Sequence, residues 1–341
     1  MSQFQINSIT DQSGTSGPVI AGVSTNNSTG CMIIPAGPTE NRGGRGRMVI
    51  YGGSNNSNYQ TDMNLVEIAT IGNATDFGDI VTAAGFSSGM ASATRGVFKQ
   101  GRGASGFYDT MRFVTFSSLG GITDFGDDRG PSQDSSASSS NGIRGIFGNG
   151  TSYDAVIRSI NIASTGDSYE FGTLAQGLYM GGGAGGGSPT RGFFFGGRIQ
   201  PPSTTVVKDI ETVLFASGGA ASKFGELTVG RRAIAAVTNN TRAVACSGDL
   251  ADGAINVMDY ITLATEGNAT DFGDIQENNE GFGAGASNAT RGLIVGCDST
   301  NTNRIDYITI ATTGNATDFG DTLDPAYLCG ACSDAHGGLA V

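Results

Sequence analysis

The stretch NATDFGDI at Asn73–Ile80 occurs again at Asn268–Ile275, and NATDFGDT occurs at Asn315–Thr322. Three weaker copies are ITDFGDD at Ile122–Asp128, SYEFGT at Ser168–Thr173 and SKFGEL at Ser222–Leu227. The Phe-Gly pair of these stretches recurs every 46 to 53 residues, at Phe77, Phe125, Phe171, Phe224, Phe272 and Phe319. Self-similarity at such a period is the signature of a repeat architecture.

Two further features keep the same period. An arginine opens an apolar run, as in RMVIYGG and RGFFFGG, at Arg47, Arg95, Arg144, Arg191, Arg242 and Arg291. After a polar turn comes an alternating run, as in NLVEIAT and DYITIAT, which starts at Asn64, Arg112, Arg158, Glu211, Asp259 and Asp306. Alternation of β-branched and aromatic residues with polar ones predicts half-buried strands, and Gly/Asn/Ser clusters predict turns.

Short runs of small residues precede the arginines. They are Gly89–Ala93, Ser135–Ser139, Gly181–Gly187, Ile234–Thr238 and Gly283–Ser287, and a sixth run, Cys329–Ser333, has no arginine after it. Each repeat thus predicts four short strands in about 47 residues, the size of a propeller blade and too long for a β-solenoid coil. Innermost strands converge on the axis, where large side chains would collide. Flexible Gly/Ser linkers are the alternative, and the regular recurrence favours strands.

The incomplete repeats at the two ends complement each other. The first repeat lacks a small-residue run before Arg47, whereas the last run, Cys329–Ser333, lacks the rest of a repeat. Pairing of this run with the strands of the first repeat would close a ring and remove exposed sheet edges. We therefore predict an all-β, six-bladed β-propeller over residues 47–341, closed by a C-terminal inner strand. Residues 1–46 are predicted to form a short β-rich attachment segment.

Composition excludes several classes of partner. Glycine accounts for 56 of 341 residues, and 31 Asp+Glu against 19 Lys+Arg give a net charge of −12. Nucleic-acid binding requires clustered Lys and Arg, and no apolar run approaches the ~18 residues of a membrane helix. The N-terminus lacks the features of a secretory signal, and five cysteines are too few for a disulfide scaffold. We expect no nucleic-acid partner, no membrane insertion and assembly in a reducing cytoplasm.

The sequence also lacks catalytic motifs. His336 is the single histidine, and Gly181–Gly187 is not followed by the GK[ST] of a phosphate-binding loop. DFGD is similar to the magnesium-binding motif of protein kinases, but its companion motifs are missing. We predict a non-enzyme with no catalytic residue, no cofactor and no metal ligand.

Four groups of residues leave alternatives open. The paired aspartates of the DFGD stretches could help to bind Ca²⁺, which takes six to eight oxygens, or could be solvated turn carboxylates. These pairs are Asp76/Asp79, Asp271/Asp274 and Asp318/Asp321, while Thr173 and Lys223 break the pattern and Asp124, Asp127 and Asp128 form the densest cluster.

The six repeated arginines could form a ligand surface, but we favour planar guanidinium groups that bind carbonyls or carboxylates between blades. Cys329 and Cys332 with His336 are one ligand short of a zinc site, which favours buried thiols. The Asn-x-Ser/Thr triplets at Asn73, Asn268 and Asn315 are expected to be turn residues.

The Gly-Gly pairs that end two of the apolar runs, Gly52-Gly53 and Gly196-Gly197, give the repeat a resemblance to kelch-type β-propellers. The pair is degraded at Gly101, Gly148–Gly150, Gly248 and Gly296, and the tryptophan of a kelch blade is absent because the chain contains none. The phenylalanine of the DFGD stretch is expected to fill its place.

More closely, the unit TRG-apolar-GG, DYITIAT, GNATDFGD resembles virion structural proteins of tailed bacteriophages, of the marine cyanophage type. Gln5–Thr25 and Cys332–Leu339 are similar to the terminal patterns of that family. The resemblance covers essentially the whole chain and implies a tail, fibre or surface-decoration component of the virion, assembled in the host cytoplasm. It implies attachment to other virion structural proteins through residues 1–46.

A second function remains open, a propeller that recognises or cleaves a host-surface glycan. Its stacking residues would be tyrosines in the turns, because tryptophan is missing, and cleavage would need two carboxylates ~5–10 Å apart. The candidate tyrosines are Tyr59, Tyr108, Tyr153 and Tyr179. The sequence predicts neither the oligomeric state nor the position on the particle.

Overall fold

The chain divides into two compact units, Met1–Asn41 and Arg42–Val341. The computed structural model describes residues 24–25, 32–33, 46–55, 58–131, 134, 136–180, 182–183, 188–200, 205–250, 253–276, 281, 283–296 and 303–335. In the first unit, β1 (Ser24–Thr25) pairs antiparallel with β2 (Met32–Ile33). Most of the predicted attachment segment, residues 1–46, lies outside the described residues.

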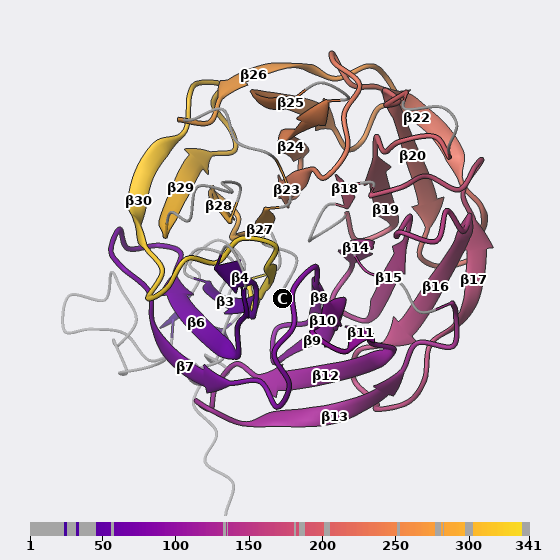
Figure 1. Ribbon diagram of the computed structural model, residues 1–341. Coiled ribbons are helices and arrows are strands. Elements are labelled where there is room, and N and C mark those ends of the chain that lie inside the picture. The colour runs from indigo at the N-terminus through magenta and orange to yellow at the C-terminus, as the bar shows by residue number, and fades with distance from the viewer. Residues whose placement is uncertain are drawn as a thin grey trace, which may run out of the picture. The chain divides into compact units, whose positions relative to one another are not determined.

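The second unit is a six-bladed β-propeller, and its described residues form strands and no helix (Figure 1). This confirms the predicted all-β class and the number of blades. Each blade is an antiparallel sheet of four strands, which follow one another from the axis outwards. Blade 1 consists of β31 (Gly330–Ser333), β3 (Arg47–Tyr51), β6 (Asp62–Glu67) and β7 (Thr75–Asp79), and blade 2 of β8 (Ser88–Ala91), β9 (Arg95–Lys99), β12 (Thr110–Thr115) and β13 (Ile122–Asp127).

The other four blades follow in chain order. Blade 3 consists of β14 (Ala137–Ser140), β15 (Arg144–Gly148), β16 (Val156–Asn161) and β17 (Tyr169–Thr173), with β21 (Gly219–Ala220) added parallel to β17, and blade 4 of β18 (Gly182–Gly183), β19 (Arg191–Phe195), β20 (Asp209–Leu214) and β22 (Ser222–Glu226). Blade 5 consists of β23 (Ala235–Thr238), β24 (Arg242–Leu250), β25 (Gly253–Thr262) and β26 (Thr270–Asp274), and blade 6 of β27 (Ala284–Ser287), β28 (Arg291–Val295), β29 (Arg304–Thr309) and β30 (Thr317–Asp321).

The ring closes as predicted, because β31 pairs with β3 from Met48↔Ser333 to Tyr51↔Gly330. Asp334 completes this closure, since its Oδ1 accepts from the backbone N–H of Arg47 at 2.7 Å and its Oδ2 lies 3.2 Å from Arg47 Nε. Asn288 Oδ1 binds the N–H of Arg291 at the same 2.7 Å within the continuous turn of blade 6. Two segments from opposite ends of the sequence therefore reproduce an ordinary turn of a blade.

The hydrophobic core consists of six clusters, one between each pair of neighbouring blades. The phenylalanine of each DFGD stretch packs into the cluster shared with the next blade. Phe77, for example, is 1% exposed and lies with Tyr51, Phe98 and Phe116 between blades 1 and 2. Phe171 is the one partly buried member of the six.

A β-bulge explains why the phenylalanine turns inward. In blade 1, Gly78 pairs with Met63 and Asp76 pairs with Asn64, so that Phe77 is the extra residue between them. A bulge breaks the simple alternation of a strand. The same register shift occurs at the corresponding place in all six blades.

The glycine after each phenylalanine lies against the backbone of the next blade. At all six interfaces a Cβ there would overlap with backbone atoms of a glycine in the following blade; the pairs are Gly78–Gly120, Gly126–Gly166, Gly172–Gly219, Gly225–Gly267, Gly273–Gly314 and Gly320–Gly72. Backbone hydrogen bonds cross the same contact, such as Gly314 N to Phe272 O at 2.7 Å. The asparagine of the repeat adds a further bond, for example from Asp274 N to Asn315 Oδ1 at 3.1 Å. The motif that recurs in the sequence is therefore an outer belt that joins neighbouring blades.

Candidate functional site

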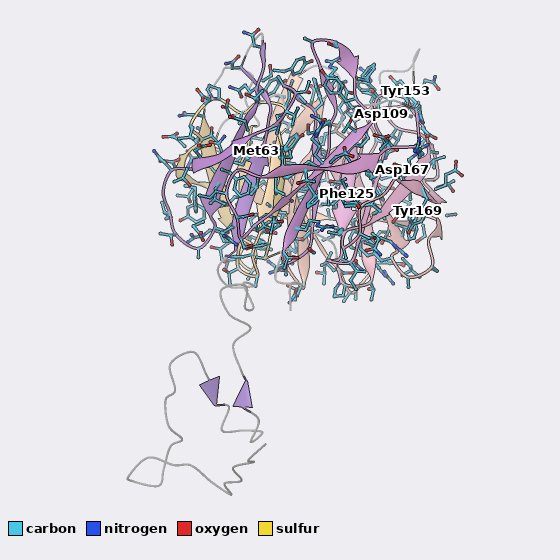
Figure 2. The ribbon with its side chains drawn as sticks, turned by 90° about the horizontal axis from the view of Figure 1, so that it is seen from below. Met63, Asp109, Phe125, Tyr153, Asp167 and Tyr169 are labelled. Carbon is cyan, nitrogen blue, oxygen red and sulfur yellow. The ribbon has the colours of Figure 1, made fainter. Side chains whose placement is uncertain are left out.

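The two faces of the propeller differ in how much their loops vary. Turns between the first and second strands and between the third and fourth strands are short and similar in sequence, and they form what we call the uniform face. Connections between the second and third strands and from the fourth strand to the next blade differ in length and composition, and they form the variable face. Asp109 and Tyr153, from two of these connections, lie toward the same end of the propeller in Figure 2. Residues that differ between blades are not needed to build the repeated four-stranded sheet. The variable face is therefore the candidate for a functional surface.

The chain enters the propeller at the uniform face. Gly46 precedes β3 there, and its carbonyl accepts from Ile68 N at 2.9 Å. The closing strand β31 also ends at this face, at Ser333. The variable face is thus opposite the point of entry.

An axial cavity of about 90 Å³ opens among the inner strands and the residues before them. Phe86, Met180, Ala233 and Leu328 line it where the chain arrives from the variable face, and their φ angles are 56°, 52°, 55° and 62°. Left-handed backbone is uncommon for residues other than glycine. Backbone bonds connect these residues between blades, from Phe86 N to Leu328 O at 2.5 Å and from Ala233 N to Met180 O at 2.7 Å. Backbone hydrogen bonds therefore join two pairs of the segments at the mouth of the cavity.

Around this mouth the same backbone bridge recurs with different side chains. Each bridge joins the segment that enters a blade to the end of its second strand or to the connection that follows it. The bridged pairs are Gly85–Arg102, Tyr179–Arg198, Arg232–Asp249 and Tyr327–Ser54. The same backbone bridge therefore holds different polar and aromatic side chains in different blades, and this arrangement is expected of a recognition surface.

One group of side chains gathers at these bridges, and we call it the Tyr–Arg cluster: Tyr153, Tyr179, Arg198 and Arg232. The two tyrosine rings stack with centroids 5.3 Å apart. The guanidinium groups of Arg198 and Arg232 lie 4.5 and 5.4 Å from the ring centroid of Tyr179. Arg232 is also 4.0 Å from Met180 Sδ, which places the cluster beside the cavity. Burial and the nearby charge of Asp134 raise the pKa of Tyr179, while the two arginines oppose the shift.

Two of the four predicted tyrosines belong to this cluster, whereas Tyr59 and Tyr108 pack elsewhere, against Gly85 and Gly103. Arg102, Arg198 and Arg232 were not predicted as candidates. Arg102 lies over the Phe86 ring at 4.4 Å and 3.1 Å from Asp134 Oδ2. These arginines fall outside the period of the repeated ones, and that departure is the sequence signal that would have found them.

The acidic candidates lie on the outer strands. Asp76, Asp271 and Asp318 are exposed, and Asp76 Oδ1 accepts from Gly78 N at 2.9 Å, which caps the bulge. The three aspartates that are densest in the sequence, Asp124, Asp127 and Asp128, do not share one environment, because Asp124 is exposed and Asp128 is buried. Within the described ranges no three His, Cys, Asp or Glu side chains come close enough together to bind a metal ion.

Asp128 instead belongs to an ionic network between blades 2 and 3. Its carboxylate lies 3.9 Å from Lys99 Nζ and 3.5 Å from Arg158 Nε, and Ser168 Oγ donates to it at 2.9 Å. Burial lowers the pKa of Lys99, and the charge of Asp128 opposes that shift. All of these residues are buried, so the network joins two blades and presents no open site.

The repeated arginines make the interblade contacts that we favoured from the sequence. Their guanidinium groups reach carbonyl oxygens of the next blade: Arg95 to Ile162 at 3.0 Å, Arg144 to Phe215, Arg242 to Ala311 at 2.8 Å and Arg291 to Ile68 at 3.0 Å. Arg191 faces Glu266 of the next blade at 3.9 Å, whereas Arg47 binds Asp334 within its own blade. Four of them also lie over an aromatic ring of their own blade: Arg95, Arg144, Arg242 and Arg291.

Substitution of Arg95, Arg242 and Arg291 by lysine is expected to destabilise the propeller by about 1 kcal/mol at each position. Lysine cannot lie flat on an aromatic ring while donating to a carbonyl, and sites this far apart contribute additively. Thermal denaturation of the triple variant measures the effect. Arg129→Lys is the control, because the Arg129 side chain is 64% exposed. An unchanged melting temperature of the triple variant would contradict the interblade role.

The two cysteines of the CxxC sequence do not converge. Cys329 packs in the cluster between blades 6 and 1, whereas Cys332 packs in the cluster between blades 1 and 2. Both are buried, and burial raises the pKa of the Cys332 thiol well above its usual range. His336 lies outside the described residues.

No known family model matches the chain, and no curated protein is similar to it in sequence. No helix in the described part of the chain is long and apolar enough to cross a membrane.

Proposed function

We propose that this chain is a non-enzymatic structural protein of a tailed-bacteriophage virion. Residues 1–46 would attach it to other virion structural proteins as a tail, fibre or decoration component. The propeller would present its variable face to the host surface or to another protein. The motifs quoted above suggest the class of particle, and the observation that carries the proposal is the difference between the two faces.

A rigid platform is what such a role requires. Every interface between blades carries a glycine-to-backbone contact in the outer belt, and β31 closes the ring. The described chain enters the propeller at the uniform face, at Gly46, and the variable face lies at the opposite end.

Recognition of a glycan is the second candidate, and the Tyr–Arg cluster favours it. Tyrosine rings beside arginines offer apolar surface and charged donors together. The described residues that line the axial cavity include no carboxylate, and we do not extend the proposal to cleavage.

Incorporation into particles tests the proposal. Epitope-tagged full-length chain and a variant lacking residues 1–46 are produced in infected host cells, and purified particles are probed for the tag. We expect the full chain in the particles and the truncated chain outside them, with both chains melting at similar temperatures. Absence of the full chain from particles, or equal incorporation of both chains, would reject the proposal.

A further inference from the structure

We infer that the Tyr–Arg cluster binds an anionic saccharide, one that carries a carboxylate or a phosphate group. The inference deepens the proposed host-surface role and depends on it. It rests on the free hydrogen-bonding capacity of Arg198, the aromatic rings beside it and the strained backbone that holds them.

Arg198 differs from an arginine that serves the fold. Arg231, the residue before Arg232, is an arginine of that kind, and it is completely buried. Its guanidinium donates to four acceptors, which are Ser247 O, Ala245 O, Val229 O and Asp259 Oδ2. Within the described residues the guanidinium of Arg198 donates one long bond, from Nη2 to Tyr153 Oη at 3.4 Å, and its buried Nε has no acceptor. A guanidinium presents five donors that suit carboxylate and phosphate oxygens. Arg198 is therefore equipped to bind an anion.

The acids near the cluster are already engaged by other arginines. Asp249 binds Arg232, and Asp134, which is completely buried, lies 3.1 Å from Arg102 Nε. No carboxylate of the described residues forms an ion pair with Arg198. On a chain of net charge −12, a partly exposed cation without an acidic partner attracts anions locally and orients them.

The aromatic rings add the second half of a saccharide site. Tyr153 and Tyr179 are partly exposed, and Arg198 contacts both of them, the Tyr153 hydroxyl through Nη2 and the Tyr179 ring through its guanidinium. The backbone holds them at a cost, because Tyr153 and Met180, the residue after Tyr179, have φ angles of 56° and 52°. Strain of this kind persists where the surroundings impose it and gathers at binding sites. A charged sugar, with an apolar ring face and an anionic group, matches both features.

Calorimetric titration of the full chain tests the inference with three probes. These are an oligogalacturonate, which carries carboxylates, a glycerol-phosphate-linked oligosaccharide, and a neutral maltooligosaccharide. We expect at least one anionic probe to bind, binding to weaken as salt is added, and the neutral probe to bind far less. Arg198→Gln should lower the affinity roughly ten- to hundredfold, the loss typical of a hydrogen bond to a charged group.

Arg129→Gln is the matched control, because it removes the same charge from an exposed arginine that is paired with Asp167 outside the cluster. It should leave the affinity unchanged, and equal melting temperatures exclude unfolding as the cause of any loss. Binding of one anionic probe and not the other identifies the source of the charge. Failure of both anionic probes to bind, or binding that Arg198→Gln leaves intact, would overturn the inference. Incorporation into particles is measured separately, so the proposed function can stand when this inference fails.

Discussion

Substitution of Asp334 by alanine is expected to lower the free energy of unfolding by about 3 kcal/mol, and we expect this effect to be among the largest of any single substitution in the chain. The side chain of Asp334 is completely buried, and it binds both the backbone and the guanidinium of Arg47. Its loss leaves a half-buried arginine without its carboxylate at the only place where the ring is not covalently continuous. Urea denaturation followed by circular dichroism measures the change.

Asp334→Asn is the informative companion variant. Asn141, Asn239 and Asn288 occupy the same place in the turns of blades 3, 5 and 6, where each Oδ1 accepts from the N–H of the repeated arginine. Asparagine should therefore keep the turn and lose the ion pair, at a cost of about 1 kcal/mol. Asp124→Ala, at an exposed position on β13, serves as the control and should change stability little. Equal effects of Asp334→Ala and Asp124→Ala would show that closure does not depend on Asp334.

The position of Asp334 shows why closure matters beyond its own bonds. Without β31, strand β3 would expose an unpaired edge, and two of the six core clusters would lose residues of blade 1. Exposed edges promote association with other chains. We therefore expect the alanine variant to aggregate as it unfolds, whereas the asparagine variant refolds.

Much of this architecture was predictable because the six repeats can be aligned with one another within the one sequence. Six copies of one period revealed the blades, and the two incomplete repeats revealed the closure, which β31 and β3 confirm. The small inner runs were predictable for a physical reason, since a Cβ at Gly89 would overlap with the backbone of Ala331 in the neighbouring inner strand.

The belt function of the repeated motif was not predictable. The roles of Asn315 and Gly273 depend on a contact between different blades, and a periodic pattern shows that a residue recurs without showing what it touches. The two arginines of the Tyr–Arg cluster were missed for the opposite reason, because they do not recur. Tyr153, Tyr179 and Arg198 come from connections of blades 3 and 4, and only the packing of these two blades brings them together.

One position in the third strand shows how far the repeat can vary. In most blades it carries a polar or acidic group that binds the segment after the preceding blade's outer strand, as Asn64 does for Leu323 N at 2.9 Å and Asp259 does for Thr228. In blade 3 the residue is Arg158, and the preceding blade supplies the acid, Asp128. The contact between blades is therefore kept although the third strand carries a basic residue in blade 3, because the preceding blade supplies an acidic partner for it. The sequence of one repeat does not show this pairing, since its two residues belong to different repeats.

A large steric effect is expected from Gly225→Ala, which should destabilise the protein by about 3 kcal/mol. Gly225 follows the belt phenylalanine of blade 4, and an added Cβ would overlap with the carbonyl oxygen of Gly267 in blade 5. That carbonyl cannot retreat easily, because Gly267 N donates to Phe224 O at 3.0 Å and Ala269 N to Glu226 O at 2.8 Å. The methyl group would therefore separate two blades along their outer strands. Equilibrium denaturation in urea checks the value.

Gly267→Ala provides a control at the other side of the same contact. A Cβ on Gly267 would meet no atom within 4 Å, and alanine restricts the unfolded chain more than glycine does. Stability should therefore change by less than about 0.5 kcal/mol. The two variants remove the same kind of residue and add the same methyl group, so only the position of the Cβ differs. If both variants melt like the unmodified protein, the outer belt does not hold the blades together; if both are equally destabilised, backbone freedom and not the contact is what the glycines supply.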